Sequence, residues 1–139
     1  MASEFKLTRR VEFSETDMAG IMHFSNYFKY MEAAEHAFMR SLGLSVAPKV
    51  YDPPIGWPRV AASCEYKRPF KYDEEVEVHL TVASKSEKAV TYGFVFRKVG
   101  ETDECARGSV TVVCCTIRDG RMQATFIPKE YAERIEVKS

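Results

Sequence analysis

Apolar side chains recur at steps of three or four residues between positions 24 and 42 of the chain. This spacing is typical of an amphipathic helix, which would be about 27 Å long at 1.5 Å per residue. Gly43 follows, and a glycine there commonly ends a helix because it readily adopts the left-handed conformation. The pattern therefore predicts one long helix with a buried face. The apolar positions of this face are Phe24, Tyr27, Phe28, Met31, Ala34, Phe38 and Leu42.

Apolar and polar residues alternate over several other segments, with the period of two residues that marks a half-buried strand. Residues 76–82 and 90–96 show this alternation most clearly. Pro128 can open a small terminal helix, because its fixed φ suits a first helical turn. We expect additional strands over residues 5–13, 60–66 and 105–118, the last closed by the turn Asp119-Gly120, and a short piece at 125–128.

One strand, one long helix and about four more strands predict an α+β fold, with the helix against one face of a curved antiparallel sheet of about five strands. A length of 139 residues favours a single domain over residues 1–139. One helix cannot cover both edges of such a sheet, and bare strand edges invite pairing. We therefore expect a homodimer that joins two sheets edge to edge.

Charge is balanced, with 20 Lys and Arg residues against 20 Asp and Glu residues, so no overall field attracts nucleic acid or a membrane. The four cysteines have no metal-ligand spacing, and we expect free thiols in a reducing compartment. The N-terminal segment lacks the apolar region of a signal peptide, and no apolar run is long enough to cross a bilayer as a helix. These features predict a cytoplasmic protein without nucleic-acid or membrane partners.

The polar loop before the long helix is the best candidate for chemistry. It holds one isolated carboxylate, Asp17, and then Gly20, whose permissive backbone lets the main chain approach a ligand closely. An aspartate before a helix is otherwise commonly a turn or capping residue. The first amides of the helix have no intrahelical acceptor and lie at the positive end of its dipole. The loop therefore brings a carboxylate and amide donors close together in the sequence.

The stretch from residue 15 to residue 27, ETDMAGIMHFSNY, resembles the signature of the hotdog-fold acyl-CoA thioesterases. More narrowly, it resembles the 4-hydroxybenzoyl-CoA thioesterase family, whose pattern is an aspartate, a glycine three residues on, and Asn-Tyr at the helix start. Here these residues are Asp17, Gly20, Asn26 and Tyr27. The resemblance implies a long helix wrapped by an antiparallel sheet, and dimers or tetramers with active sites at subunit interfaces.

The resemblance also implies roles for three residues of the loop. Asp17 would be the catalytic carboxylate, as a nucleophile or as a general base toward water, and the backbone N–H of Phe24 would polarise the thioester carbonyl. His23 could orient the loop, contact the substrate or donate a proton to the leaving thiolate, and an orienting role is favoured. The family varies at this position, and a histidine there argues against the 4-hydroxybenzoyl substrate but not against the thioesterase chemistry.

We therefore expect hydrolysis of a small or medium acyl thioester, aromatic ones included, carried by coenzyme A or by an acyl carrier protein. The reaction requires no metal and no bound cofactor. Two other functions stay open on the same fold. One is a hydratase or dehydratase that uses His23 with a carboxylate, and the other is a non-catalytic module that binds acyl-CoA or a carrier protein.

Several residues are candidates for binding the acyl group. Gly20, Asn26, Tyr27, Glu35 and Trp57 are expected near the substrate. Asn26 and Tyr27 could instead be ordinary helix-start and core residues. Glu35 lies on the apolar side of the predicted helix, and Trp57 could line the acyl pocket or pin the proline-rich segment around it.

Lys67, Arg68 and Lys71 form a small basic group that could contact the phosphates of coenzyme A or could be a solvated face. Glu35 and His36 are adjacent, so they lack the Glu-x-x-His spacing of a di-metal site, and no metal is expected. His79 alternates outward with acidic neighbours along its strand, which predicts a solvated side chain.

Overall fold

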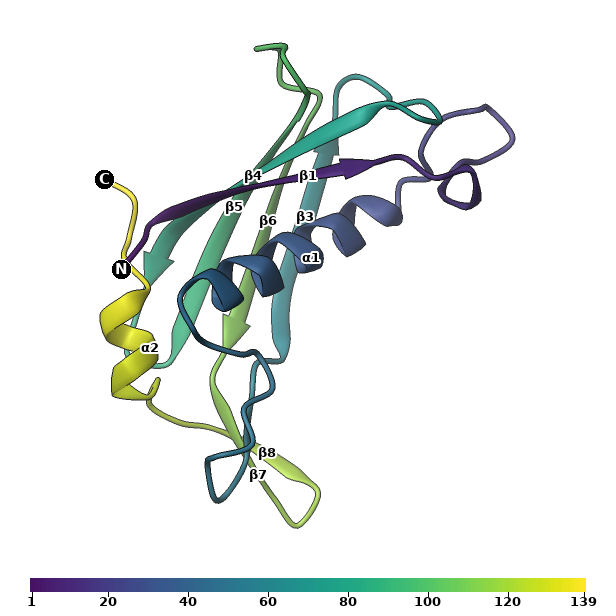
Figure 1. Cartoon of the computed structure of the whole chain (residues 1–139). Helices are drawn as coiled ribbons and strands as arrows, with labels where there is room; N and C mark the ends of the chain where they lie inside the picture. Colours follow the sequence, from purple (N-terminus) through teal and green to yellow (C-terminus); the bar gives the residue numbers. More distant parts are fainter.

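The computed structural model describes residues 1–139 and places one long helix against a five-stranded sheet (Figure 1). The helix, α1, runs from Asn26 to Ser41. Every pair of neighbouring strands is antiparallel. The α+β architecture and the five-stranded antiparallel sheet are therefore confirmed. The strands, in their order across the sheet, are β1 (Glu4–Arg10), β4 (Glu75–Lys85), β5 (Ala89–Lys98), β6 (Ala106–Val113) and β3 (Arg59–Tyr66).

A second, three-stranded sheet projects from one end of the main sheet (Figure 1). It contains β2 (Ile55–Gly56), β7 (Cys115–Arg118) and β8 (Arg121–Ala124). The chain also forms a 3-10 turn, η1 (Phe13–Glu15), and a short helix, α2 (Lys129–Arg134).

The small sheet corrects two boundaries of the sequence analysis. The run predicted as one strand over 105–118 divides at Cys114, because Cys115 leaves the main sheet and pairs with Gly56. The strand expected at 125–128 lies instead at 121–124. The reason is the tight turn at Asp119-Gly120, with φ of 50° and 74°, which pairs Arg118 with Arg121.

The predicted buried face of the long helix is confirmed for Tyr27, Met31, Ala34 and Phe38, all of which are buried. The helix begins two residues later than its apolar spacing suggests. Phe24 therefore precedes it and is 60% exposed. The helix ends where expected, because Gly43 has a φ of +74°.

The core forms where α1 packs against β1 and β4. The side chains of Val76, Val78, Leu80 and Val82 alternate inward along β4 and are all buried, as the period of two predicted. Phe38 of α1 connects the two layers, because its ring lies 6.3 Å from the ring of Phe5.

Two predictions about the first half of the sheet are wrong in detail. The first strand ends at Arg10 rather than residue 13, because Phe13 starts the 3-10 turn η1 and is exposed. His79 is half-buried rather than solvated. Its Nε2 lies 2.8 Å from Oε1 of Glu4, which the neighbouring strand β1 brings alongside.

The last strand of the main sheet, β3, has one unpaired edge and is exposed along almost its whole length. Val60, on this strand, is 61% exposed. All four cysteines are free thiols. None of the helices has both the length and the apolar character needed to cross a membrane.

Replacing Phe38 by alanine should lower the free energy of unfolding by about 3–5 kcal/mol, because it removes a fully buried ring and leaves a cavity. Urea unfolding followed by circular dichroism measures the change. Phe126→Ala is the control, because Phe126 is exposed and its loss should have a small effect. Equal effects of the two substitutions would contradict the assignment of Phe38 to the core.

Candidate functional site

Asp17 lies on a tight turn that protrudes before the helix. Thr16 and Met22 pair on either side of the turn, and the N–H of Gly20 donates to the carbonyl oxygen of Asp17 at 2.9 Å. Gly20 has a φ of +80°, a conformation that suits glycine. Oδ1 of Asp17 accepts the N–H of Ala19 at 2.9 Å, whereas Oδ2 accepts no hydrogen bond within the chain. The turn thus holds the carboxylate and leaves one oxygen free.

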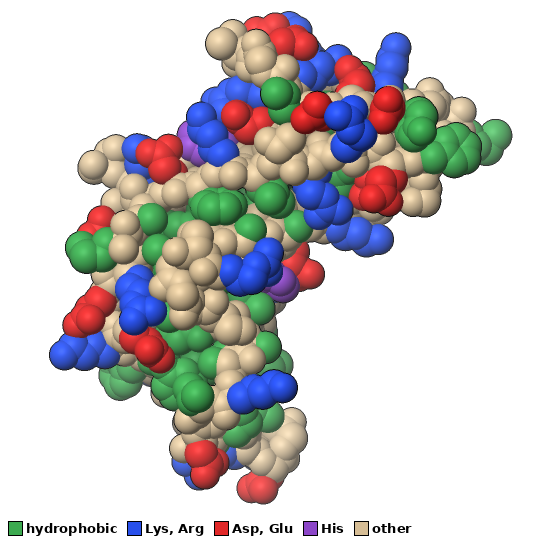
Figure 2. Space-filling view, in the orientation of Figure 1, with side chains coloured by type: hydrophobic (Ala, Val, Ile, Leu, Met, Phe, Trp, Pro, Cys, Tyr) green, Lys and Arg blue, Asp and Glu red, His purple; other side chains and the backbone are tan.

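The Asp17 carboxylate faces an open hollow of about 500 Å³ at one end of the molecule. Gly20 also lines the hollow, together with the exposed side chains of Phe13, Met18 and Tyr72. Figure 2 shows hydrophobic side chains on the surface at this end of the molecule. Within a single chain, a charged group is therefore surrounded by apolar surface that is open to solvent.

The turn is tied to the helix through Glu15. The carbonyl oxygen of Glu15 accepts the N–H of His23 at 2.8 Å and the side-chain Nδ2 of Asn26 at 2.9 Å. Its side-chain Oε1 accepts the N–H of Glu12 at 2.8 Å and the hydroxyl of Tyr30 at 2.7 Å. Burial and the bond to Glu15 raise the pKa of Tyr30, so its hydroxyl remains a donor at neutral pH. These bonds fix the position of Asp17 relative to the start of α1.

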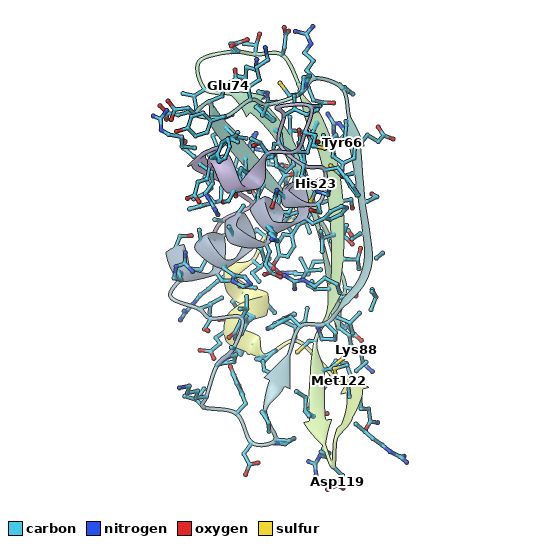
Figure 3. The ribbon with its side chains drawn as sticks, turned by 90° about the vertical axis from the view of Figure 1, so that its right-hand side faces the viewer. His23, Tyr66, Glu74, Lys88, Asp119 and Met122 are labelled. Atoms are coloured by element: carbon cyan, nitrogen blue, oxygen red, sulfur yellow. The ribbon has the colours of Figure 1, made fainter.

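The two peptides on either side of Phe24 are each held by a hydrogen bond. The carbonyl of His23 accepts the N–H of Asn26 at 3.0 Å, and the carbonyl of Phe24 accepts the hydroxyl of Tyr66 at 3.0 Å. Burial raises the pKa of Tyr66 to about 12. The N–H of Phe24 donates to no acceptor within the chain. A free donor therefore lies at the beginning of the helix, where Figure 3 shows His23 and Tyr66 close together.

His23 is held at the same place by its own side chain. Its Nδ1 lies 2.8 Å from Oγ of Ser25, and its ring centre lies 4.6 Å from that of Phe24. Neither His23 nor Phe24 lines the hollow that contains Asp17. A single copy of the chain therefore does not place the carboxylate and the free amide on one shared cavity.

A separate chamber of about 270 Å³ lies between α1 and the strands β3, β5 and β6. It exists because α1 packs closely on β1 and β4, at the other side of the sheet. Phe28, the third residue of α1, lines the chamber and follows Phe24 by four residues in the sequence. Its walls are mainly apolar and come from Phe28, Met31, Ala62, Phe94 and Val110.

The chamber also contains four polar groups. Glu35 is 2% exposed and is paired with Arg59, which also contacts Glu32 at 3.4 Å. Burial raises the pKa of Glu35, and the Arg59 charge opposes this effect. The Tyr92 side chain is fully buried and its hydroxyl has no hydrogen-bond partner. Such an unpaired group costs about 1–3 kcal/mol.

Three residues expected near the substrate are buried in supporting positions. Asn26 donates to Glu15, and the Tyr27 ring packs against aromatic neighbours, including Phe70 at 6.1 Å. The Trp57 ring packs at a tilt against that of Tyr131 of α2, with ring centres 5.5 Å apart, and Trp57 does not line the chamber. These placements favour the helix-start, core and pinning alternatives for Asn26, Tyr27 and Trp57 respectively. Glu35, by contrast, lines the chamber.

The basic group of three residues is partly neutralised. Lys67 is paired with Glu104, and Arg68 lies 2.8 Å from Asp103. Lys71 has no acidic partner, and its backbone pairs with Ile21, just after the Asp17 turn. Of the three, Lys71 is therefore the unpaired cation beside the loop. No group of three or more His, Cys, Asp or Glu side chains in the chain is arranged to hold a metal.

Four residues of the site were missing from the sequence analysis: Glu15, Arg59, Tyr66 and Tyr92. Of these four residues, only Arg59 could have been expected from the sequence. A carboxylate on an apolar helix face, as at Glu35, needs a buried cation nearby. The tyrosines look like ordinary strand residues, and Glu15 acts partly through its backbone.

Comparison with known proteins agrees with the fold. The family model of the Thioesterase-like superfamily matches residues 11–135. A hypothetical protein from Aquifex aeolicus is 36% identical to this chain and superposes on it with a TM-score of 0.83. The match covers 95% of this chain and 99% of that protein. A gentisyl-coenzyme A thioesterase is 28% identical, with a TM-score of 0.80 and coverage of 92% of this chain and 99% of that one.

The 4-hydroxybenzoyl CoA thioesterase from Pseudomonas sp. strain CBS-3 has the same fold, with a TM-score of 0.84 at 22% identity over 95% of this chain and 99% of that one. The hotdog fold implied by residues 15–27 is therefore confirmed, and with it the resemblance to this group of enzymes. The chain belongs to the Thioesterase-like superfamily.

Proposed function

We propose that this protein hydrolyses acyl-CoA thioesters, with Asp17 as the catalytic carboxylate and the N–H of Phe24 as the donor to the thioester carbonyl. The observation that carries the proposal is the free amide at the start of α1, fixed beside a turn whose carboxylate keeps one oxygen free. Membership of the Thioesterase-like superfamily supports the same reaction class.

The chemistry follows from the two groups. The amide stabilises the negative charge that develops on the carbonyl oxygen, which can be worth about 2.7–4 kcal/mol in the transition state. An Asp17 oxygen either attacks the carbonyl carbon, expelling the thiolate and leaving a mixed anhydride, or takes a proton from an attacking water. His23, held by Ser25, orients the donor peptide. The reaction needs no metal or bound cofactor.

The substrate we propose is a small acyl group on coenzyme A. A chamber of about 270 Å³ suits an acyl group the size of one ring, and the similar proteins named above include gentisyl- and 4-hydroxybenzoyl-CoA thioesterases. Lys71 is the cation we assign to the coenzyme A phosphates, because Lys67 and Arg68 already have acidic partners. A carrier-protein thioester is the other substrate class to test.

The active assembly we propose is a homodimer. The exposed β3 edge can pair with the same strand of a second copy, and this edge also bounds the chamber through Ala62. A second copy would also supply the surface that one chain lacks between the Asp17 hollow and Phe24. A cytoplasmic location is expected for this enzyme.

Asp17→Asn should lower kcat by about 10²–10⁴-fold, because the amide keeps the shape of the carboxylate but is neither a nucleophile nor a base. Thiol release from short, medium and aromatic acyl-CoAs, and from an acyl carrier protein thioester, measures the effect. Binding of the substrate should persist in this variant. Near-normal hydrolysis by a folded Asp17→Asn protein would remove Asp17 from the mechanism, and hydration of an enoyl-CoA without thiol release would favour a hydratase.

Asn26→Ala should reduce kcat by about 10–100-fold with little change in KM, because the Asp17 turn loses one of its ties to the helix without losing a substrate contact. Steady-state kinetics separates the two parameters. Asn26→Asp is the matched variant, since it keeps the volume but cannot donate to the Glu15 carbonyl. A rise in KM at constant kcat would instead assign Asn26 to substrate binding.

Light scattering should give twice the mass of one chain for the purified protein. Val60→Lys should shift it toward the monomer, because a lysine on an edge strand opposes pairing with another strand. Val99→Lys places the same charge at an exposed position away from β3 and should leave the dimer intact. A monomeric wild-type protein with full activity would contradict the proposed assembly.

A further inference from the structure

Two of the four polar residues of the chamber, Glu35 and Tyr92, are buried. Glu35 comes from the middle of α1, and Tyr92 comes from β5 beneath it. Both side chains are at most 2% exposed. The rest of the lining is largely apolar, so these two groups would be the main polar contacts of an acyl group inside.

Tyr92 provides the first half of a recognition site. Its hydroxyl is buried, unpartnered and part of the chamber lining. A phenolic hydroxyl is both a donor and an acceptor. An oxygen atom on a bound acyl group would supply the acceptor that the protein does not.

Glu35 provides the second half. Arg59 donates to it, and the backbone carbonyl of Trp57 and the carboxylate of Glu32 also accept from Arg59. His36 is the other titratable group beside Glu35, with Nε2 3.9 Å from Oε1. Two carboxylates share one guanidinium, so the site has an excess of negative charge. A neutral donor suits this site, whereas a second anion would be repelled.

We propose, on the basis of the proposed thioesterase function, that Tyr92 and Glu35 determine specificity by reading an uncharged hydroxyl group on the acyl part of the substrate. The hydroxyl accepts from Tyr92 and donates to Glu35, and Arg59 is the positioning residue that holds Glu35. An unsubstituted acyl group leaves the Tyr92 hydroxyl unpaired, and a carboxylated one meets like charge. Discrimination by buried hydrogen-bonding groups is stronger than discrimination by apolar contact.

The test compares benzoyl-CoA, its monohydroxy isomers and carboxybenzoyl-CoA. In the wild-type protein, kcat/KM for the best hydroxy isomer should exceed that for benzoyl-CoA by about tenfold or more. Tyr92→Phe should remove most of this preference. Tyr51→Phe, which deletes a hydroxyl bonded to Glu130 outside the chamber, should keep it. No preference in the wild type, or an undiminished preference in Tyr92→Phe, would overturn the assignment.

Glu35→Gln gives an independent test that does not depend on the folding of Tyr92→Phe. Removing one negative charge should raise the rate with carboxybenzoyl-CoA, relative to benzoyl-CoA, by about tenfold. An unchanged ratio would overturn the role of Glu35. Tyr92→Phe itself should unfold at a temperature no lower than the wild type, because its hydroxyl has no hydrogen bond to lose.

Calorimetric dissociation constants separate this inference from the reaction itself. With Asp17→Asn, the hydroxy isomer should bind about tenfold more tightly than benzoyl-CoA, and adding Tyr92→Phe should abolish the difference. If no thioester is hydrolysed but this binding difference is present, the proposed reaction fails and the recognition site stands. If hydrolysis occurs without the difference, the recognition site fails and the reaction stands.

Discussion

The carbonyl oxygen of Glu15 receives two hydrogen bonds from the start of the long helix, one from the N–H of His23 and one from the Asn26 side chain. This junction is the constraint on which the candidate site depends. Without it, the bond from the Tyr30 hydroxyl to the Glu15 side chain would be the remaining hydrogen bond from α1 to Glu15. Catalysis by positioned groups is sensitive to shifts of about 1 Å. The junction therefore matters more for catalysis than for the free energy of folding, to which its two hydrogen bonds contribute little.

Apolar burial and polar positioning use different faces of the same helix. The stripe around Phe38 packs on β1 and β4 and stabilises the fold. The side that faces β3, β5 and β6 stands off the sheet and leaves the chamber. One helix thus acts as a structural layer, as the wall of a cavity and, at its beginning, as a source of free amides. Glu35 interrupts the apolar stripe at the chamber, where Arg59 compensates its charge.

The edge of the sheet connects the site to the proposed assembly. β3 supplies Tyr66, which donates to the Phe24 carbonyl, and Arg59, which holds Glu35. The same strand is exposed along its outer edge. Pairing of two copies at this edge would therefore place both Tyr66 and Arg59 next to the interface. Opposite charges are also paired locally: Glu104 neutralises Lys67 and Asp103 neutralises Arg68, whereas Lys71 has no acidic partner.

The sequence by itself determined the features that arise from local order: the long helix, the alternating strands, the stop at Gly43, and the loop with Asp17 and Gly20. These follow from periodicity and backbone preference, which act between near neighbours. Only the tertiary structure decided which residues meet across the chain. The pairing of Glu35 with Arg59 joins residues 24 positions apart, and the bond from Tyr66 to Phe24 joins residues 42 positions apart. The orphaned hydroxyl of Tyr92 arises from packing alone. Phe24 lies outside the helix, because the helix begins two residues later, at Asn26, whose N–H donates to the His23 carbonyl. No local pattern encodes such contacts, because they depend on how the helix and the sheet pack against each other.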